Sequence, residues 1–392
     1  MHTIIFQPAI FTISIFTIIL LSIFAISALV ILFVVINNAQ KKTSIITSRD
    51  LIKRIVPKMR IGYPDIPSHR VWVETLNEYG YLAPLTSVGN HIVLGTPQMG
   101  GTSIFRYLVS RFNTSFPEHA GMCAYVDVNQ IVMSHKNTGY VSIEEIYRQV
   151  IWSSIKFPMA ELESQIKQGA FKRTGLAKLL RDVDGILKSS LSKIEPTTLR
   201  QILFKIWQII GVKRVIYIVD NITALEPGAV PVLLEYMLRT FGRTPSVSFI
   251  ISGDPTTLVL NKRTNDGNVG AQLSHDVNIA LNISEILLSK AKQDQDIYTI
   301  RTSYLAKLIK FIQPAIELPE KNNISIVQEF FHNPEAWDAI FNLNNGELEN
   351  ISASIQEVVE YHQSTKKKIT GEWVRKMFTA RTVKSEDQAG GS

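Results

Sequence analysis

The feature that most limits how this chain can fold is its N-terminal apolar run. From Thr3 to Asn37 there is no charged side chain, and Ile, Leu, Phe and Val dominate. A helix needs about 20 apolar residues to cross the roughly 30 Å of bilayer hydrocarbon, so this run is long enough to cross once. A cleaved signal peptide would have basic residues before a shorter apolar region, whereas the sole basic residue before this run is His2. We therefore expect one transmembrane helix over residues 3–37.

Basic residues follow the apolar run and indicate its orientation. They are Lys41, Lys42, Arg49, Lys53, Arg54, Lys58 and Arg60. Segments rich in Lys and Arg remain on the cytoplasmic side of a membrane, so the rest of this single-pass chain is expected to face the cytoplasm. The single cysteine, Cys123, excludes an intramolecular disulfide and favours a reducing compartment. Five Asn-x-Ser/Thr triplets would be glycan acceptors outside the cell, but two of them abut expected buried strands.

Beyond the apolar run, the composition is that of a globular, basic protein. Hydrophobic residues make up 45% of the chain, and the formal net charge is +7. That hydrophobic content is enough for a buried core, and the charge suits an anionic partner such as nucleic acid or acidic lipid. Lys and Arg are spread along the chain, however, and aromatic and basic residues do not alternate as they do in proteins that stack single strands. A nucleic-acid partner is therefore an open but not a favoured interpretation.

Short apolar runs alternate with amphipathic stretches, and this alternation predicts the fold class. Residues 38–84 carry four prolines and mixed charge, which predicts a juxtamembrane linker with one short helix over Arg70–Tyr79. Residues 85–283 are expected to form an α/β domain with a parallel sheet covered by helices. The expected strands are His91–Gly95, Met122–Val128, Arg214–Asp220, Val247–Ser252 and Val277–Leu281.

Helical patterns occupy most of the remaining sequence. The stretch from Asn129 to Lys213 is too long for one crossover and predicts inserted helices between the second and third strands. From Ser284 the pattern is helical, which predicts a helical lid subdomain over residues 284–365 and a basic helix with a polar tail over residues 366–392. The expected helices are Thr102–Phe112, Ser142–Ser154, Glu161–Gln168, Leu176–Ser192, Thr197–Ile210, Pro231–Phe241, Ile300–Ile312, Ile324–Phe331 and Leu348–Tyr361.

The segment HIVLGTPQMGGTS, residues 91–103, has the strand, loop and helix order of a phosphate-binding loop. Glycines let backbone N–H groups converge on an anion, and the following helix adds partial positive charge at its N-terminus. Thr102 holds the hydroxyl position that would bind magnesium, but Gly101 stands where the pattern G-x-x-x-x-G-K-[ST] has lysine. The candidate phosphate-binding residues are Gly95, Thr96, Pro97, Gln98, Met99, Gly100, Gly101, Thr102 and Ser103.

Two later strands end in polar residues that could complete this site. The apolar strand RVIYIVD ends at Asp220, whose carboxylate is expected to hold magnesium together with Thr102. Asn221 follows it directly. The strand SVSFIIS leads to Ser252 and Asp254, which could sense a terminal phosphate. Asn221, Ser252 and Asp254 are thus the candidate catalytic residues.

From about Leu82 to Ile355, the chain resembles the AAA+-related ATPases of the STAND and archaeal-type ATPase group. This resemblance implies a P-loop NTPase core with ATP and Mg²⁺ as cofactors. Val277–Leu288, VNIALNISEILL, fits the fifth strand of that group and the capped helix after it. Asn344–Ile351, NNGELENI, stands where the group has a Gly-Asn-Pro-Arg type motif, but it contains Glu347 and no arginine.

Three departures from that group point to weak catalysis. The loop has no lysine, the lid motif has no arginine, and Asn221 stands where related enzymes have a glutamate that acts as general base. General-base assistance is typically worth 10²- to 10⁴-fold in rate. The favoured function is therefore a membrane-anchored nucleotide-binding or pseudo-ATPase scaffold, which works as a homo-oligomer or with a protein partner.

Two other functions stay open at this point. An active Mg²⁺-dependent ATPase would need a cation from elsewhere, for which Lys262, Arg263 or a neighbouring subunit's Arg243 are candidates. A membrane-tethered binder of nucleic acid or anionic lipid would use the basic run Lys366–Lys368 and the basic residues after Asn38.

Overall fold

A computed structural model describes twelve segments of the chain. They are residues 48–59, 61–62, 64–115, 121–135, 141–168, 176–189, 194–225, 229–241, 244–253, 277–289, 294–316 and 324–379. The transmembrane helix expected over residues 3–37 lies outside them. Within these segments, no helix combines the length and the apolar character that crossing a membrane requires.

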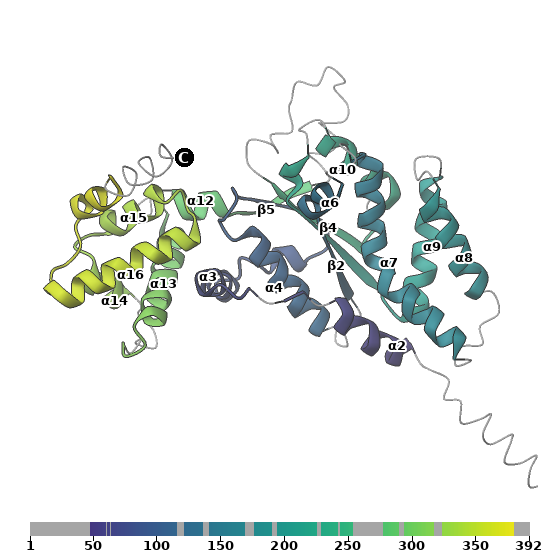
Figure 1. Cartoon of the computed structure of the whole chain (residues 1–392), viewed down its shortest axis with the longest axis horizontal. Coiled ribbons are helices and arrows are strands. Elements are labelled where there is room, and N and C mark those ends of the chain that lie inside the picture. The colour runs from purple at the N-terminus through teal and green to yellow at the C-terminus, as the bar shows by residue number, and fades with distance from the viewer. Residues whose placement is uncertain are drawn as a thin grey trace, which may run out of the picture.

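The centre of the protein is a five-stranded parallel sheet with the order β2-β3-β4-β1-β5 (Figure 1). The prediction of a parallel sheet is confirmed, and each strand agrees with its expected bounds to within one residue at either end. The strands are β1 Asn90–Leu94, β2 Gly121–Asp127, β3 Arg214–Asp220, β4 Val247–Gly253 and β5 Val277–Asn282.

Helices cover both faces of the sheet because the connections between its strands run in two directions. From β1 the chain crosses to β2 at one edge, and from β2 through β4 it returns in the opposite direction. Since parallel crossovers are right-handed, the two directions place their helices on opposite faces. The helices between β1 and β4 are α4 Gly101–Thr114, α6 Val128–Ser134, α7 Ile143–Lys167, α8 Leu176–Lys188, α9 Pro196–Ile210 and α10 Ala229–Phe241.

Two hydrophobic cores result, one on each face. Alternate side chains of β3 belong to different cores, as strand geometry requires: Tyr217 and Val219 face the core under α6–α10, and Ile216 and Ile218 face the core under α4. Both sides of these strands are apolar for this reason, and this continuous apolar character is what made them recognisable in the sequence.

The crossover between β2 and β3 contains inserted helices, as expected, but the prediction of separate helices over Ser142–Ser154 and Glu161–Gln168 is wrong. One helix, α7, runs through Pro158. Proline removes a backbone N–H and normally ends or kinks a helix. Here Ile155, Met159 and Leu162 on both sides of the proline are buried in the same core, so packing along one helix face holds the two halves together.

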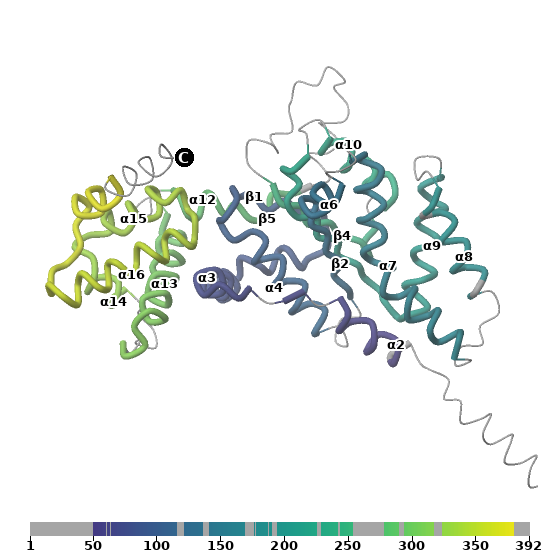
Figure 2. The backbone as a smooth tube through the Cα atoms, in the orientation of Figure 1, coloured from purple at the N-terminus to yellow at the C-terminus, as the bar shows by residue number. Residues whose placement is uncertain are grey.

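Residues assigned to the linker from the sequence also pack into the folded body. Helix α2, Ser48–Ile55, buries Leu51 and Ile55 in the core under α7 and α9. Helix α3, Pro67–Glu78, buries Trp72 and Leu76 in the other core, beside α4 and the C-terminal helices. The tube in Figure 2 shows α2 near the lower end of α7 and α3 near the C-terminal helices.

The C-terminal part is helical, as expected, and continues the core that contains α3 and α4. Its helices are α12 Ile283–Leu288, α13 Gln295–Ile312, α14 Ile324–Phe330, α15 Pro334–Leu343 and α16 Leu348–Thr365, and residues 371–379 are also helical. Helix α15 was expected only as part of this helical region and not as a separate helix, although Asn333 caps it and Pro334 opens it, which is a common helix start. We refer to α12–α16 as the helical subdomain.

Candidate functional site

A cavity of about 190 Å³ opens at the carboxyl ends of β1, β3 and β4. In open parallel sheets, ligands bind outside these strand ends where neighbouring connections leave to opposite faces. Here the connection from β1 leaves toward α4, and that from β3, which is separated from β1 by β4, leaves toward α10 on the other face. The lining residues are His69, Gly95, Thr96, Pro97, Gln98, Gly100, Gly101, Thr102, Ser103, Asp220, Asn221, Thr223, Ser252 and Gly253.

Most of the candidate site residues are thus brought together around one cavity. Of those named from the sequence, Met99 is absent from the lining because its side chain points into the core. Asp254 lies outside the described residues. His69, Thr223 and Gly253 line the cavity without having been singled out. Gly253 could have been predicted, because it is next to Ser252 at the end of β4. No local pattern marks His69, which comes from α3.

The loop between β1 and α4 has an unusual backbone and leaves the N-terminus of α4 without a side-chain cap. Gln98 and Gly100 have positive φ angles of 69° and 90°, and the Gly95 N–H donates to the Gly253 carbonyl at 3.0 Å. Gly100 is the N-cap of α4 and provides no side-chain cap. The first N–H groups of α4 therefore lack the oxygen that usually caps a helix and remain suited to an anion.

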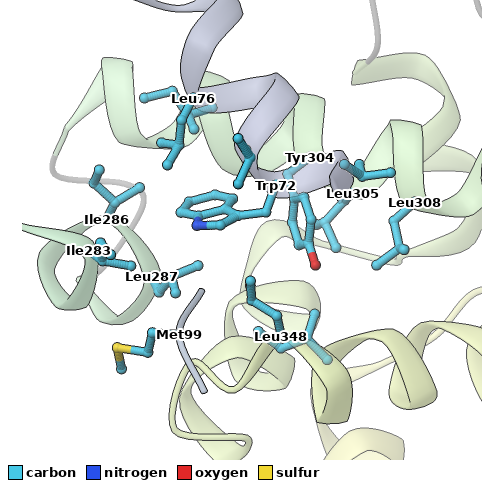
Figure 3. Packing of buried hydrophobic residues seen from close by; sticks show 14 of the residues in the cluster. Trp72, Leu76, Met99, Ile283, Ile286, Leu287, Tyr304, Leu305, Leu308 and Leu348 are labelled. Carbon is cyan, nitrogen blue, oxygen red and sulfur yellow. The ribbon is translucent and has the colours of Figure 1, made fainter. Parts of the chain in front are cut away.

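The helical subdomain packs directly on this loop. The Leu348 N–H donates to the Gln98 carbonyl at 3.3 Å. A Cβ atom on Gly346 would lie 2.8 Å from Met99 Cε, and one on Gly100 would lie 2.7 Å from Leu348 Cδ1, so these glycines permit close approach. Figure 3 shows Met99 and Leu348 on either side of the loop, within the cluster that includes Trp72. The shape of the loop consequently depends on the start of α16.

Asp220 is buried at the back of the cavity and is surrounded by donors. Its Oδ1 accepts from the Asn221 N–H at 2.8 Å, and its Oδ2 accepts from the Tyr125 hydroxyl at 2.9 Å. Thr102 and Ser252 also hydrogen-bond to this carboxylate. Burial raises the pKa of Asp220, and these hydrogen bonds oppose that shift because they favour the charged form. The Thr102 contact joins the loop to the end of β3.

Asn221 is fixed in a conformation that commits its amide. Its φ angle is 56°, and its Nδ2 donates to Asp127 Oδ1 at 2.9 Å. Its backbone N–H also approaches Ser252 Oγ at 2.7 Å. This contact between the end of β3 and the end of β2 therefore occupies the side-chain amide of Asn221, and an amide cannot accept a proton from water in any case.

His69 reaches the cavity from α3. Its Nδ1 lies 2.8 Å from Ser103 Oγ, and its Nε2 lies 3.7 Å from Glu349 Oε1 on α16. Burial lowers the pKa of His69, and the Glu349 carboxylate opposes this shift. Among the described residues that line the cavity none is Lys or Arg, and His69 is the one that can carry a positive charge.

Thr102 and Asp220 supply hard oxygen donors of the kind that Mg²⁺ prefers. The described part of the chain contains no group of three or more His, Cys, Asp or Glu residues arranged to hold a metal. Mg²⁺ is commonly held by one or two protein oxygens together with water and substrate phosphates. The residues therefore fit Mg²⁺ that arrives with a phosphate-bearing ligand.

Two larger cavities, each of about 520 Å³, lie elsewhere. One lies beside β2 and α7 and includes Trp152 and Lys156, and the other includes Arg111 and Arg214. Neither contains the loop or Asp220, so we regard the smaller cavity as the candidate site.

Comparison with the sequence models of known protein families finds no match. A search among curated proteins also finds no similar sequence.

Proposed function

We propose that this cavity binds the phosphates of a nucleoside triphosphate together with Mg²⁺. The observation that carries the proposal is the contact between Thr102 and Asp220, because it joins a glycine-rich loop at a helix N-terminus to a carboxylate at the end of a nearby strand. Backbone N–H groups of the loop would hold phosphate oxygens, and Thr102 and Asp220 would hold the metal. The protein would thus be a P-loop NTPase-like nucleotide binder.

We further propose that binding is weak and hydrolysis negligible. A missing lysine removes one cation from the phosphates, and Asn221 provides no general base. The cations considered as replacements, Arg243, Lys262 and Arg263, lie outside the described residues. Such a domain would act as a nucleotide-dependent scaffold, anchored by residues 3–37 and facing the cytoplasm, with the helical subdomain as the surface for a second copy or another protein.

The direct test is ATP binding to the purified full-length chain in detergent, measured by calorimetry with and without Mg²⁺. We expect saturable binding that needs Mg²⁺ and no measurable phosphate release. Asp220→Ala should abolish the dependence on Mg²⁺, whereas Asp184→Asn, which removes the same charge from an exposed position of α8, should bind as the unsubstituted chain does.

Two other outcomes would change the assignment. Phosphate release that disappears in Asp220→Ala would identify a working ATPase in place of a scaffold. Absence of ATP binding at any Mg²⁺ concentration would refute the nucleotide proposal.

A further inference from the structure

His69 is the feature of the cavity that the proposed function does not yet use. It belongs to α3, which precedes the sheet in the chain, and yet it contacts the first turn of α4 through Ser103. Its side chain is 10% exposed, and its Nε2 has no hydrogen-bond partner among the described residues. A buried polar atom without a partner costs free energy, so this atom needs an explanation.

The surroundings of the ring decide which nitrogen carries the proton. The Glu349 carboxylate lies 3.7 Å from Nε2, and a nearby negative charge favours an N–H group on that side. Nδ1 then accepts a hydrogen bond from the Ser103 hydroxyl at 2.8 Å. The neutral ring therefore holds its Nε2–H group buried beside the cavity, without a hydrogen-bond partner among the described residues and too far from Glu349 to be satisfied by it.

We propose that His69 is a phosphate-contacting residue that compensates for the missing lysine of the loop. This inference rests on the proposed nucleotide function. A phosphate oxygen of the ligand accepts a hydrogen bond from His69 Nε2–H and provides the partner that this atom lacks. Because Nε2 is buried, the phosphate reaches it when the neighbouring Glu349 side chain, which is 61% exposed, turns toward solvent, and the Glu349 charge disfavours the phosphate until it does.

Two substitutions of His69 separate contact with phosphate from packing. In His69→Asn, the amide reaches the position of Nδ1 and keeps a partner for Ser103, but nothing replaces Nε2. In His69→Gln, the amide nitrogen reaches the position of Nε2. Because a hydrogen bond to a charged group contributes strongly to binding, His69→Asn should weaken MgATP binding to the full-length chain by about ten- to a hundredfold. His69→Gln should keep the MgATP affinity within about threefold of that of the unsubstituted chain.

The choice of ligands makes the test specific to phosphate. Inorganic tripolyphosphate should lose affinity in His69→Asn as MgATP does, and adenosine should not. Glu349→Gln should tighten MgATP binding by about fivefold, since it removes a like charge that faces the phosphate. Circular dichroism and thermal melts of each variant verify that it is folded.

The outcomes distinguish this inference from the function on which it rests. Absence of ATP binding by the unsubstituted chain would refute the proposed function and this inference with it. ATP binding that is unchanged in His69→Asn would overturn the inference alone. Equal losses in the Asn and Gln variants, or a loss that extends to adenosine, would assign His69 a structural role and would overturn it as well.

Discussion

Introducing a lysine into the loop is the sharpest test of the proposed phosphate site. Gly101 occupies the lysine position, and a Cβ atom placed on it would meet nothing nearer than Ile283 Cδ1 at 4.0 Å. Its φ angle is not positive, unlike that of Gly100, so a side chain is accepted without backbone strain. We therefore expect Gly101→Lys to fold and to place an ammonium group beside the bound phosphates.

The magnitude follows from the Coulomb energy of one ion pair. At about 4 Å, two unit charges attract by about 1 kcal/mol in water and by about 4 kcal/mol at an effective dielectric constant of about 20. The cavity opens to solvent, which favours the lower half of this range. Gly101→Lys should then tighten MgATP binding by about five- to fiftyfold, and added salt should reduce the gain.

Calorimetry of the full-length chain with MgATP measures this change, and Gly101→Met is the matched control. Methionine has similar length and equally removes glycine's unfolded-state flexibility, but it carries no charge. If the Lys and Met variants bind MgATP with equal affinity, or if the gain does not depend on salt, the loop does not surround phosphate as we propose.

Three further predictions concern Asp220, the glycine that packs against Met99 and a buried ion pair of the helical subdomain. Asp220→Asn should raise the thermal midpoint at pH 7, because the folded-state pKa of Asp220 lies above its unfolded value. The stability that this pKa shift gives is present at acidic pH and is lost as the pH rises through the raised pKa. Thermal melts of the two proteins should therefore converge in acid. Gly346→Val should weaken MgATP binding in calorimetry and also lower the melting temperature, since its side chain would displace Met99 and distort the loop. A lower melting temperature with unchanged MgATP binding would contradict the idea that the helical subdomain shapes the loop. Arg301→Met should lower the free energy of unfolding in urea by about 3–5 kcal/mol, because Arg301 is fully buried and pairs with Asp338 at 3.0 Å, and a loss below about 1 kcal/mol would contradict this.

The sequence predicted the strands well because each combines apolar residues suited to burial on both faces. It also predicted which residues meet at the carboxyl edge, since Thr102, Asp220 and Ser252 each follow or end such a strand and parallel strands share that edge. Local pattern was sufficient for these residues.

Other features depend on contacts between distant parts of the chain. The packing of α7 through Pro158 is determined by the core beneath it and not by its own sequence. His69 meets Ser103 because α3 lies against α4, and Gly346 meets Met99 because the helical subdomain folds back on the loop. Such pairings leave no local periodicity to detect. The start of α15 at Asn333 and Pro334, by contrast, carried a recognisable signal.

The burial of α2 limits how far the folded body can lie from a membrane. If residues 3–37 cross a bilayer as proposed, the ten residues 38–47 are all that separate the bilayer from a helix packed into the protein core. A fully extended chain of that length spans about 35 Å at most. The folded body then lies within about 35 Å of the lipid headgroups. A binding partner wider than this distance must approach from the side away from the membrane.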